Sequence, residues 1–176
     1  TATVEGTELE VHAHIYVVPV VEYLSATFAS PERLETQDDY DALKGEYDNY
    51  ENDDAWKGDV MYAKLALCSR DEVVKNAEVT ASDFVSEDSV ITSDNVEAKW
   101  LKEVQANIGR GNPYAPVENF PDVIYKGGKT DIEPESVKYS WITINVPVDA
   151  EPGTYEGTFT VTADGLEEPY EFTYSF

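Results

Sequence analysis

Three β-rich segments at the C-terminal end of the chain constrain its fold more than any other feature of the sequence. Residues 139–147, 155–163 and 169–176 are separated by short stretches rich in Asp, Glu, Pro and Gly. Within the first segment, side chains alternate between two sets, a period typical of a strand with one buried face. Pro147 ends this strand because it has no N–H to donate. The pattern predicts an antiparallel meander that buries Ser140, Ile142, Ile144 and Val146.

Further segments with the same alternation precede this meander. We interpret residues 8–19 as a half-buried strand, residues 60–67 as a central strand and residues 77–81 as a short strand. Residues 96–108 fit either a strand or a helix, and we favour a strand. Because strands do not alternate with helices, we predict an all-β fold, an antiparallel two-sheet β-sandwich of the immunoglobulin or galactose-binding kind. The length of 176 residues suits one domain, residues 1–176.

Two long loops are expected between these strands. Residues 32–59 carry eleven acidic side chains without a helical apolar stripe, which indicates a solvated excursion. Residues 109–121 contain three prolines and two glycines, which disfavour regular hydrogen-bonded structure. Gly109 and Gly111 in this loop do not complete a phosphate-binding fingerprint, because Asn112 and Pro113 stand where a helix should open.

The charge balance excludes several classes of partner. Twelve Lys and Arg against 36 Asp and Glu give a formal net charge of −24. A chain this acidic is a poor binder of polyanions, so we expect no nucleic acid, no insertion into membranes and, through like-charge repulsion, a monomer. No apolar run is long enough to span a bilayer, and no signal peptide opens the chain. We expect further chain after Phe176, because the last residues still alternate like a strand.

The acidic excursion contains the best candidates for a metal site. Asp48, Glu51, Asp53 and Asp54 could gather oxygen ligands around Ca²⁺. Their spacing lacks the glycine and glutamate of an EF-hand, and a solvated acidic loop is the interpretation we prefer. We therefore expect no cofactor, with calcium as the alternative.

Two histidines and one cysteine are further candidates for a metal site or a nucleophile. His12 and His14, with Glu10, share one face of the first predicted strand and could bind zinc, but two solvent-facing histidines are the simpler interpretation. Cys68 has no neighbouring base to activate it and is expected to pack as a small apolar residue. Carboxylate pairs have no diagnostic value in a chain with 36 of them.

Carbohydrate binding would use exposed aromatic rings on loops. Tyr47 and Tyr50 in the acidic excursion and Tyr114 in the proline loop are the candidates, with Trp56 beside them. Single aromatic residues in a sandwich more often pack between strands. For Trp56 and Trp141 we prefer that structural role.

A hairpin and several landmarks before it resemble a known family. Residues 141–161 contain Val146-Pro147 and the run Asp149-Ala150-Glu151-Pro152-Gly153-Thr154-Tyr155-Glu156-Gly157. Residues 55–59, 61–67, 79–84 and 120–124 precede it in the same order as in that family. Together they resemble the N-terminal β-sandwich of glycoside hydrolase family 123 and related bacterial proteins, over about residues 55–163.

The resemblance implies an accessory sandwich that precedes a catalytic (β/α)-barrel acting on glycans with N-acetylgalactosamine. The family's catalytic Asp-Glu pair lies in the barrel, so no catalytic residue transfers to this chain and we expect no enzymatic activity from it alone. The implied partner is the downstream barrel of the same polypeptide, and the implied location is extracytoplasmic, secreted or at the cell surface. A carbohydrate-binding module and a cell-surface interaction or adhesion domain are the alternatives. The acidic, tyrosine-rich insertion before Trp56 departs from the family pattern.

Overall fold

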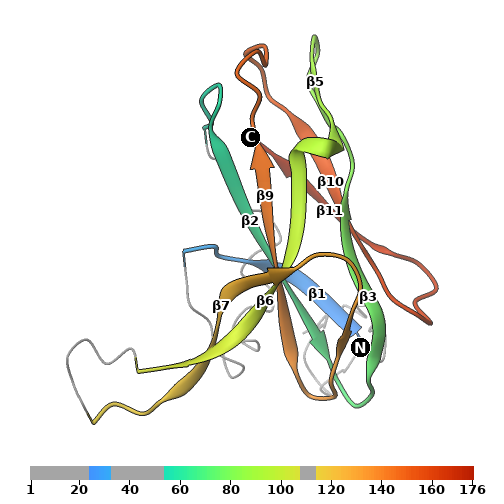
Figure 1. The fold of residues 1–176 in the computed structure, drawn as a ribbon. Coiled ribbons are helices and arrows are strands. Elements are labelled where there is room, and N and C mark those ends of the chain that lie inside the picture. Colours follow the sequence, from blue (N-terminus) through green and yellow to red (C-terminus); the bar gives the residue numbers. More distant parts are fainter. Residues whose placement is uncertain (1–23, 33–53, 108–113) are drawn as a thin grey trace, which may run out of the picture.

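The structure is a computed structural model that describes residues 24–32, 54–107 and 114–176. These residues form two antiparallel sheets that face each other around one main apolar core (Figure 1). The predicted two-sheet antiparallel β-sandwich is confirmed. The predicted strand over residues 8–19 and most of the acidic excursion lie outside the described residues.

The first sheet has the order β1-β2-β9-β6-β7. Its centre is β2 and β9, which pair over nine residues from Val60↔Asn145 to Cys68↔Val137. The central position of β2 confirms the prediction made from its apolar residues on both sides. The strands of this sheet are β1 (Leu24–Ala29), β2 (Val60–Ser69), β6 (Val96–Ala106), β7 (Glu118–Lys126) and β9 (Val137–Asn145).

The second sheet has the order β5-β4-β10-β3-β8, and β11 also pairs with β10. β10 and β11 form a hairpin, with pairs from Glu156↔Ser175 to Val161↔Tyr170. The predicted three-stranded meander is wrong at its first strand, because β9 lies in the first sheet and pairs with β2 and β6 instead of β10. A short 3₁₀ helix, η2 (Ser93–Asn95), leads into the first sheet. The strands are β3 (Val74–Ala81), β4 (Phe84–Val85), β5 (Val90–Ile91), β8 (Thr130–Ile132), β10 (Glu156–Thr162) and β11 (Tyr170–Ser175).

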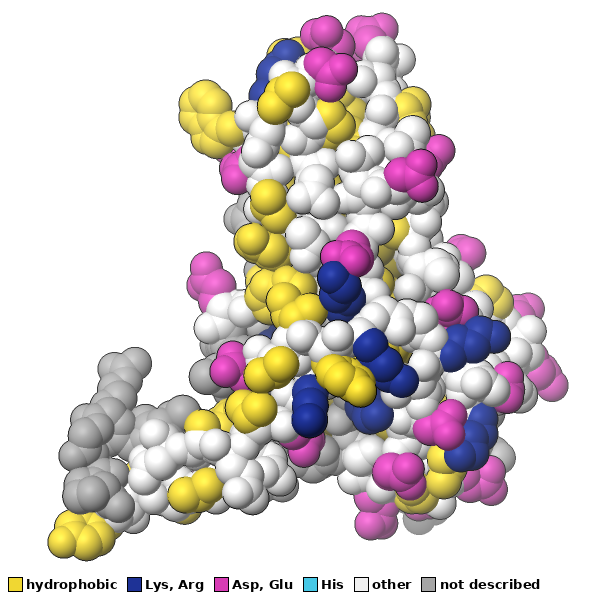
Figure 2. Space-filling model, viewed as in Figure 1, with side chains coloured by type: hydrophobic (Ala, Val, Ile, Leu, Met, Phe, Trp, Pro, Cys, Tyr) yellow, Lys and Arg dark blue, Asp and Glu magenta, His cyan; other side chains and the backbone are white. Residues whose placement is uncertain are grey.

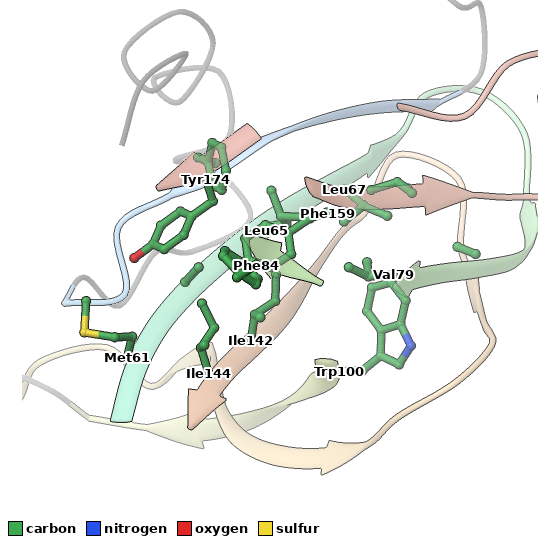
Figure 3. Packing of buried hydrophobic residues seen from close by; sticks show 14 of the residues in the cluster. Met61, Leu65, Leu67, Val79, Phe84, Trp100, Ile142, Ile144, Phe159 and Tyr174 are labelled. Carbon is green, nitrogen blue, oxygen red and sulfur yellow. The ribbon is translucent and has the colours of Figure 1, made fainter. Parts of the chain in front are cut away.

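Side chains from both sheets interdigitate in the main core (Figure 3). The predicted inward set of β9 is buried, and Ile142 and Ile144 are fully so. Opposite them, the rings of Phe84 and Phe159 lie 5.9 Å apart, and the ring of Tyr174 lies 5.5 Å from that of Phe159. Burial of apolar surface at about 25 cal/mol per Å² makes this aromatic group a major source of stability.

The segment that fitted either a helix or a strand is a strand. β6 pairs with β9 from Val96↔Ile144 to Trp100↔Ser140 and with β7 from Trp100↔Lys126 to Ala106↔Glu118, so its two halves find partners on different strands. Its register against β7 shifts between Trp100 and Leu101 and again between Lys102 and Glu103. The extra residues, Tyr125 and Asp122, lie on β7, so the bulges interrupt the period of two residues in β7 and not in β6.

The predicted proline loop over residues 109–121 is wrong at its C-terminal end. Residues 118–121 belong to β7, and Pro121 pairs with Glu103 next to a register shift. Proline is tolerated there because β7 is the edge strand of its sheet and a bulge relieves the ladder of its missing N–H. Four other strands, β1, β4, β5 and β8, were not predicted; β4 and β5 span two residues each and β8 spans three.

A second, smaller apolar cluster lies on the outer face of the first sheet. Ala29, Ala66, Val137 and Tyr139 are buried there, and Cys68 and Leu101 pack against them. Cys68 therefore packs as predicted. Lys64 is only 2% exposed, and its ammonium nitrogen lies 5.3 Å from the centre of the Tyr139 ring.

A polar contact fastens β3 to β8 at the bend in β3. Asn76 has a positive φ of 54°, at the register shift between Val74 and Ala77. Its backbone N–H donates to Asp131 at 3.0 Å, and Lys75 donates to the same carboxylate at 2.7 Å. The hydrogen bond from Lys75 is the main reason that the pKa of Asp131 is lowered, and the same bond raises the pKa of Lys75.

Replacing Asp131 by Asn is expected to reduce the loss of folding stability at acidic pH. A carboxyl group whose pKa is lowered on folding stabilises the fold above its unfolded pKa, and this contribution is lost as the pH falls below about 4. The wild type should therefore lose more stability than Asp131→Asn between pH 6 and pH 2, measured by urea unfolding. Asp122→Asn, at an exposed position on β7, is the control and should follow the wild type. Parallel profiles for all three proteins would contradict the expectation.

Candidate functional surfaces

Only one of the four predicted calcium ligands lies among the described residues. Asp48, Glu51 and Asp53 lie outside the described residues, as do Glu10, His12 and His14 of the zinc alternative. Asp54 is exposed. In the part of the chain that the structure describes, no group of three or more His, Cys, Asp or Glu side chains lies close enough together to hold a metal ion.

Only one of the three predicted carbohydrate-binding tyrosines lies among the described residues. Tyr47 and Tyr50 lie outside the described residues, whereas Tyr114 is 92% exposed. Tyr114 lies between β6 and β7, at the far end of the ribbon that these two strands form (Figure 1). It lines neither of the two clefts described below.

The expected structural role of Trp56 is wrong, whereas Trp141 does pack. Trp141 is half-buried, and its ring lies 5.4 Å from that of Tyr62 on the neighbouring strand. Trp56 is 81% exposed. It stands in a turn where Asp59 N–H donates to Trp56 O, and Gly58, with a φ of 81°, donates to Val146 O at 3.0 Å. The Asp59 carboxylate also accepts from Val60 N–H at 2.8 Å. Since the turn does not depend on the indole ring, the ring is free to face solvent.

The turn with Trp56 forms one wall of a cleft of about 540 Å³ at one end of the sandwich. The opposite wall is the loop after β9, with Ala150 and Pro152, and Phe176 closes the cleft. Backbone bonds in both directions between Tyr155 and Phe176 hold the last residue in place. We call this the hairpin-end cleft.

A second cleft, of about 580 Å³, lies where β6 and β7 diverge from β9. Three lysines line it, Lys102, Lys126 and Lys138, against two carboxylates, Glu103 and Glu133. Three lysines and two carboxylates give the lining of this cleft a formal charge of +1, whereas the net charge of the whole chain is −24. Figure 2 shows Lys and Arg side chains gathered on this part of the face among apolar side chains. We call this the ribbon-base cleft.

Comparison with known proteins places this architecture in a family. The model of the glycoside hydrolase 123 N-terminal domain matches residues 29–163, which is more than two thirds of the chain. The chain belongs to this family of N-terminal domains. The family 123 resemblance expected from the hairpin and its landmarks is thus confirmed.

A solved structure supports the assignment of this family 123 domain. A family 123 glycoside hydrolase from Clostridium perfringens, whose structural analysis concerned glycolipid glycan hydrolysis, is 42% identical with a TM-score of 0.80. The similarity covers 88% of this chain but only 27% of that enzyme, so the chain spans about a quarter of its relative. No curated protein matches in sequence.

More distant structures are less similar to this chain in sequence and in fold. The ASH/PapD-like domain of human CEP192 is 12% identical with a TM-score of 0.44, over 95% of each chain. A FixG-related protein from Vibrio parahaemolyticus is 10% identical with a TM-score of 0.42, over 89% of this chain and 96% of that one. At these scores neither adds to the family assignment.

The sequence did not point to the ribbon-base cleft. Its lysines are distributed over 37 positions, from Lys102 to Lys138, and they meet only because β6, β7 and β9 converge. The one signal for this cleft in the sequence was the enrichment of lysine over residues 99–138 relative to the rest of the chain. Among the described residues there is no helix able to cross a membrane.

Proposed function

We propose that this chain is a non-catalytic accessory module that packs beside and orients the catalytic domain of a family 123 glycoside hydrolase-like polypeptide. One observation carries the proposal: a relative that is 42% identical over 88% of this chain is an enzyme of which the chain covers only 27%. The family model names an N-terminal domain. The remainder of such an enzyme, and with it the proposed catalytic barrel, would continue beyond β11.

The chemistry of the described residues supports a structural role. A general acid of a glycosidase needs a carboxyl group whose pKa is raised. The pKa of Asp131 is shifted the other way, by its hydrogen bond from Lys75, and this carboxylate holds two strands together. The largest buried side chains, among them Phe84, Phe159 and Tyr174, fill the core between the sheets.

The proposal is tested by removing the module from the longer polypeptide. Deleting residues 1–176 should lower the melting temperature of the remaining catalytic part, since a surface covered by the sandwich becomes exposed. A loss of about 1 kcal/mol corresponds to about 2–4 °C for a domain of 150–250 residues, which calorimetry resolves. The isolated chain should not hydrolyse an aryl N-acetylgalactosaminide.

Two results would refute this role. One is turnover of the aryl glycoside by the isolated chain that disappears on unfolding. The other is a deletion that leaves both the melting temperature and kcat/KM of the catalytic part unchanged. The extracytoplasmic location stays a prediction, which fractionation of the source cells would check.

A further inference from the structure

The β6–β7 ribbon exposes apolar surface that the sandwich does not cover. Pairing between β6 and β9 ends at Trp100↔Ser140, whereas β6 and β7 stay paired as far as Ala106↔Glu118. Beyond Trp100 the two strands therefore extend from the body as a ribbon (Figure 1). Two strands alone are only marginally stable in water.

Both faces of the β6–β7 ribbon expose apolar side chains. Val123, Ile124 and Tyr125 are 44%, 49% and 62% exposed. Val123 and Ile124 are successive residues of β7 and point to opposite faces, so neither face of the strand is fully covered there. Contact with another protein surface would bury these side chains and stabilise the ribbon.

Two lysines at the base of this ribbon lack acidic partners among the described residues. No carboxylate of the described residues lies within 4.0 Å of the ammonium nitrogen of Lys102 or Lys126, although acidic residues outnumber basic ones three to one in the chain. The ammonium nitrogen of Lys102 lies 5.8 Å from the centre of the Tyr125 ring, which leaves its donors available. Two such lysines next to exposed apolar side chains complement a surface that presents carboxylates beside apolar residues.

A second copy of this chain does not fit as the partner. A symmetric dimer through this surface would place the lysines of one copy against the same lysines of the other, because a two-fold interface contacts itself. The remaining exterior is acidic, which adds repulsion between copies. Screening over about 8 Å at physiological salt still lets the local lysines attract an acidic surface at contact distance.

We propose that Lys102, Tyr125 and Lys126, at the base of the β6–β7 ribbon, form the surface on which the catalytic domain of the same polypeptide docks, through carboxylates that pair with the two lysines. The inference rests on the proposed function and names the surface that performs it. Interfaces between domains of one chain bury about 600–1,500 Å² and are partly polar, which suits a ribbon with apolar faces and a basic base.

A zero-length carbodiimide cross-link tests the pairing directly. The reagent joins an amine to a carboxylate only when they are in contact, and it should link Lys102 or Lys126 of the longer polypeptide to an Asp or Glu beyond residue 176. Mass spectrometry of the digested, monomeric product identifies the linked peptides. Links from these lysines only to residues within 1–176 would overturn the proposal.

Charge reversal tests the energetic role. Lys102→Glu with Lys126→Glu in the longer polypeptide should remove at least half of the change in melting temperature that deletion of residues 1–176 produces. Lys102→Arg with Lys126→Arg should retain it. Lys57→Glu, an exposed lysine at the hairpin-end cleft, is the matched control and should behave as wild type. Melting of the isolated chain with each substitution confirms that the sandwich itself still folds.

The outcomes separate this inference from the proposed function. If deletion lowers the melting temperature but charge reversal at the ribbon base does not, the accessory role stands and the docking surface lies elsewhere. If Lys57→Glu alone has the effect, the hairpin-end cleft is that surface. If deletion has no effect, the proposed function fails together with the inference. An acidic oligosaccharide, sialyllactose, that binds the isolated wild type but not the double reversal, with melting of the longer polypeptide unchanged, would overturn docking in favour of a glycan site.

Discussion

Replacing Phe159 by Ala is expected to lower the free energy of unfolding of this chain by about 3–5 kcal/mol. Phe159 is fully buried on β10, and its ring lies within 6.3 Å of the rings of Phe28, Phe84 and Tyr174. These rings come from strands of both sheets. A cavity at this position cannot collapse without moving several strands, so most of the lost contact remains unfilled.

The loss is measured by urea unfolding of the 176-residue chain or by its melting temperature, which should fall by about 6–20 °C at about 2–4 °C per kcal/mol. Trp56→Ala is the matched control, because it removes a larger aromatic ring that is 81% exposed. Its effect should stay within about 0.5 kcal/mol. Similar losses for the two variants would contradict the assignment of Phe159 to the core.

Replacing Gly157 by Ala is expected to destabilise the fold by about 1–3 kcal/mol, although it adds a single methyl group. A Cβ atom at this position would lie 2.8 Å from two carbon atoms of the Phe84 ring. That ring is fully buried and packs against Phe159, Tyr174 and Phe176, so it cannot move away without disturbing its neighbours. Urea unfolding measures the effect.

A nearby glycine and a compensating substitution make this test specific. At Gly153, an added Cβ would lie 3.4 Å from Ser86, an ordinary contact, so Gly153→Ala should be close to neutral. Phe84→Leu destabilises by itself, but it also makes room next to residue 157. The double variant Gly157→Ala with Phe84→Leu should therefore lose less stability than the sum of the single variants. Additive losses would show that the ring is not the cause.

The two glycines also give a physical reason for the segment from β9 to β10 that carries the family resemblance. Gly153 belongs to the turn, whereas Gly157 is the point on β10 where the backbone approaches the Phe84 ring. Tyr155, between them, is buried, and its hydroxyl donates to Glu151 O at 2.7 Å. These contacts hold the end of the sandwich at which β11 finishes.

The candidate sites were less predictable than the strands. Tyr114 was expected to be exposed as part of a carbohydrate site; the structure shows the exposure, and Tyr114 lines neither of the two clefts described above. Trp56 was expected to pack and faces solvent, because its turn is closed by backbone bonds. Exposure of a single ring depends on neighbours from other segments, so a local pattern cannot decide it.

The amino-acid sequence by itself determined the fold class, the three C-terminal strands and the family. These follow from local properties: a period of two residues, turn residues between strands, and a connection from β9 to β10 whose Pro and Gly positions meet specific backbone demands. Tertiary structure alone decided that β6 and β7 leave the sheet as a ribbon, that Pro121 can lie in an edge strand, and that Lys102, Lys126 and Lys138 share one cleft. Pairing between strands distant in the sequence creates these features, and no local pattern encodes which strands will pair or where a bulge will make them diverge.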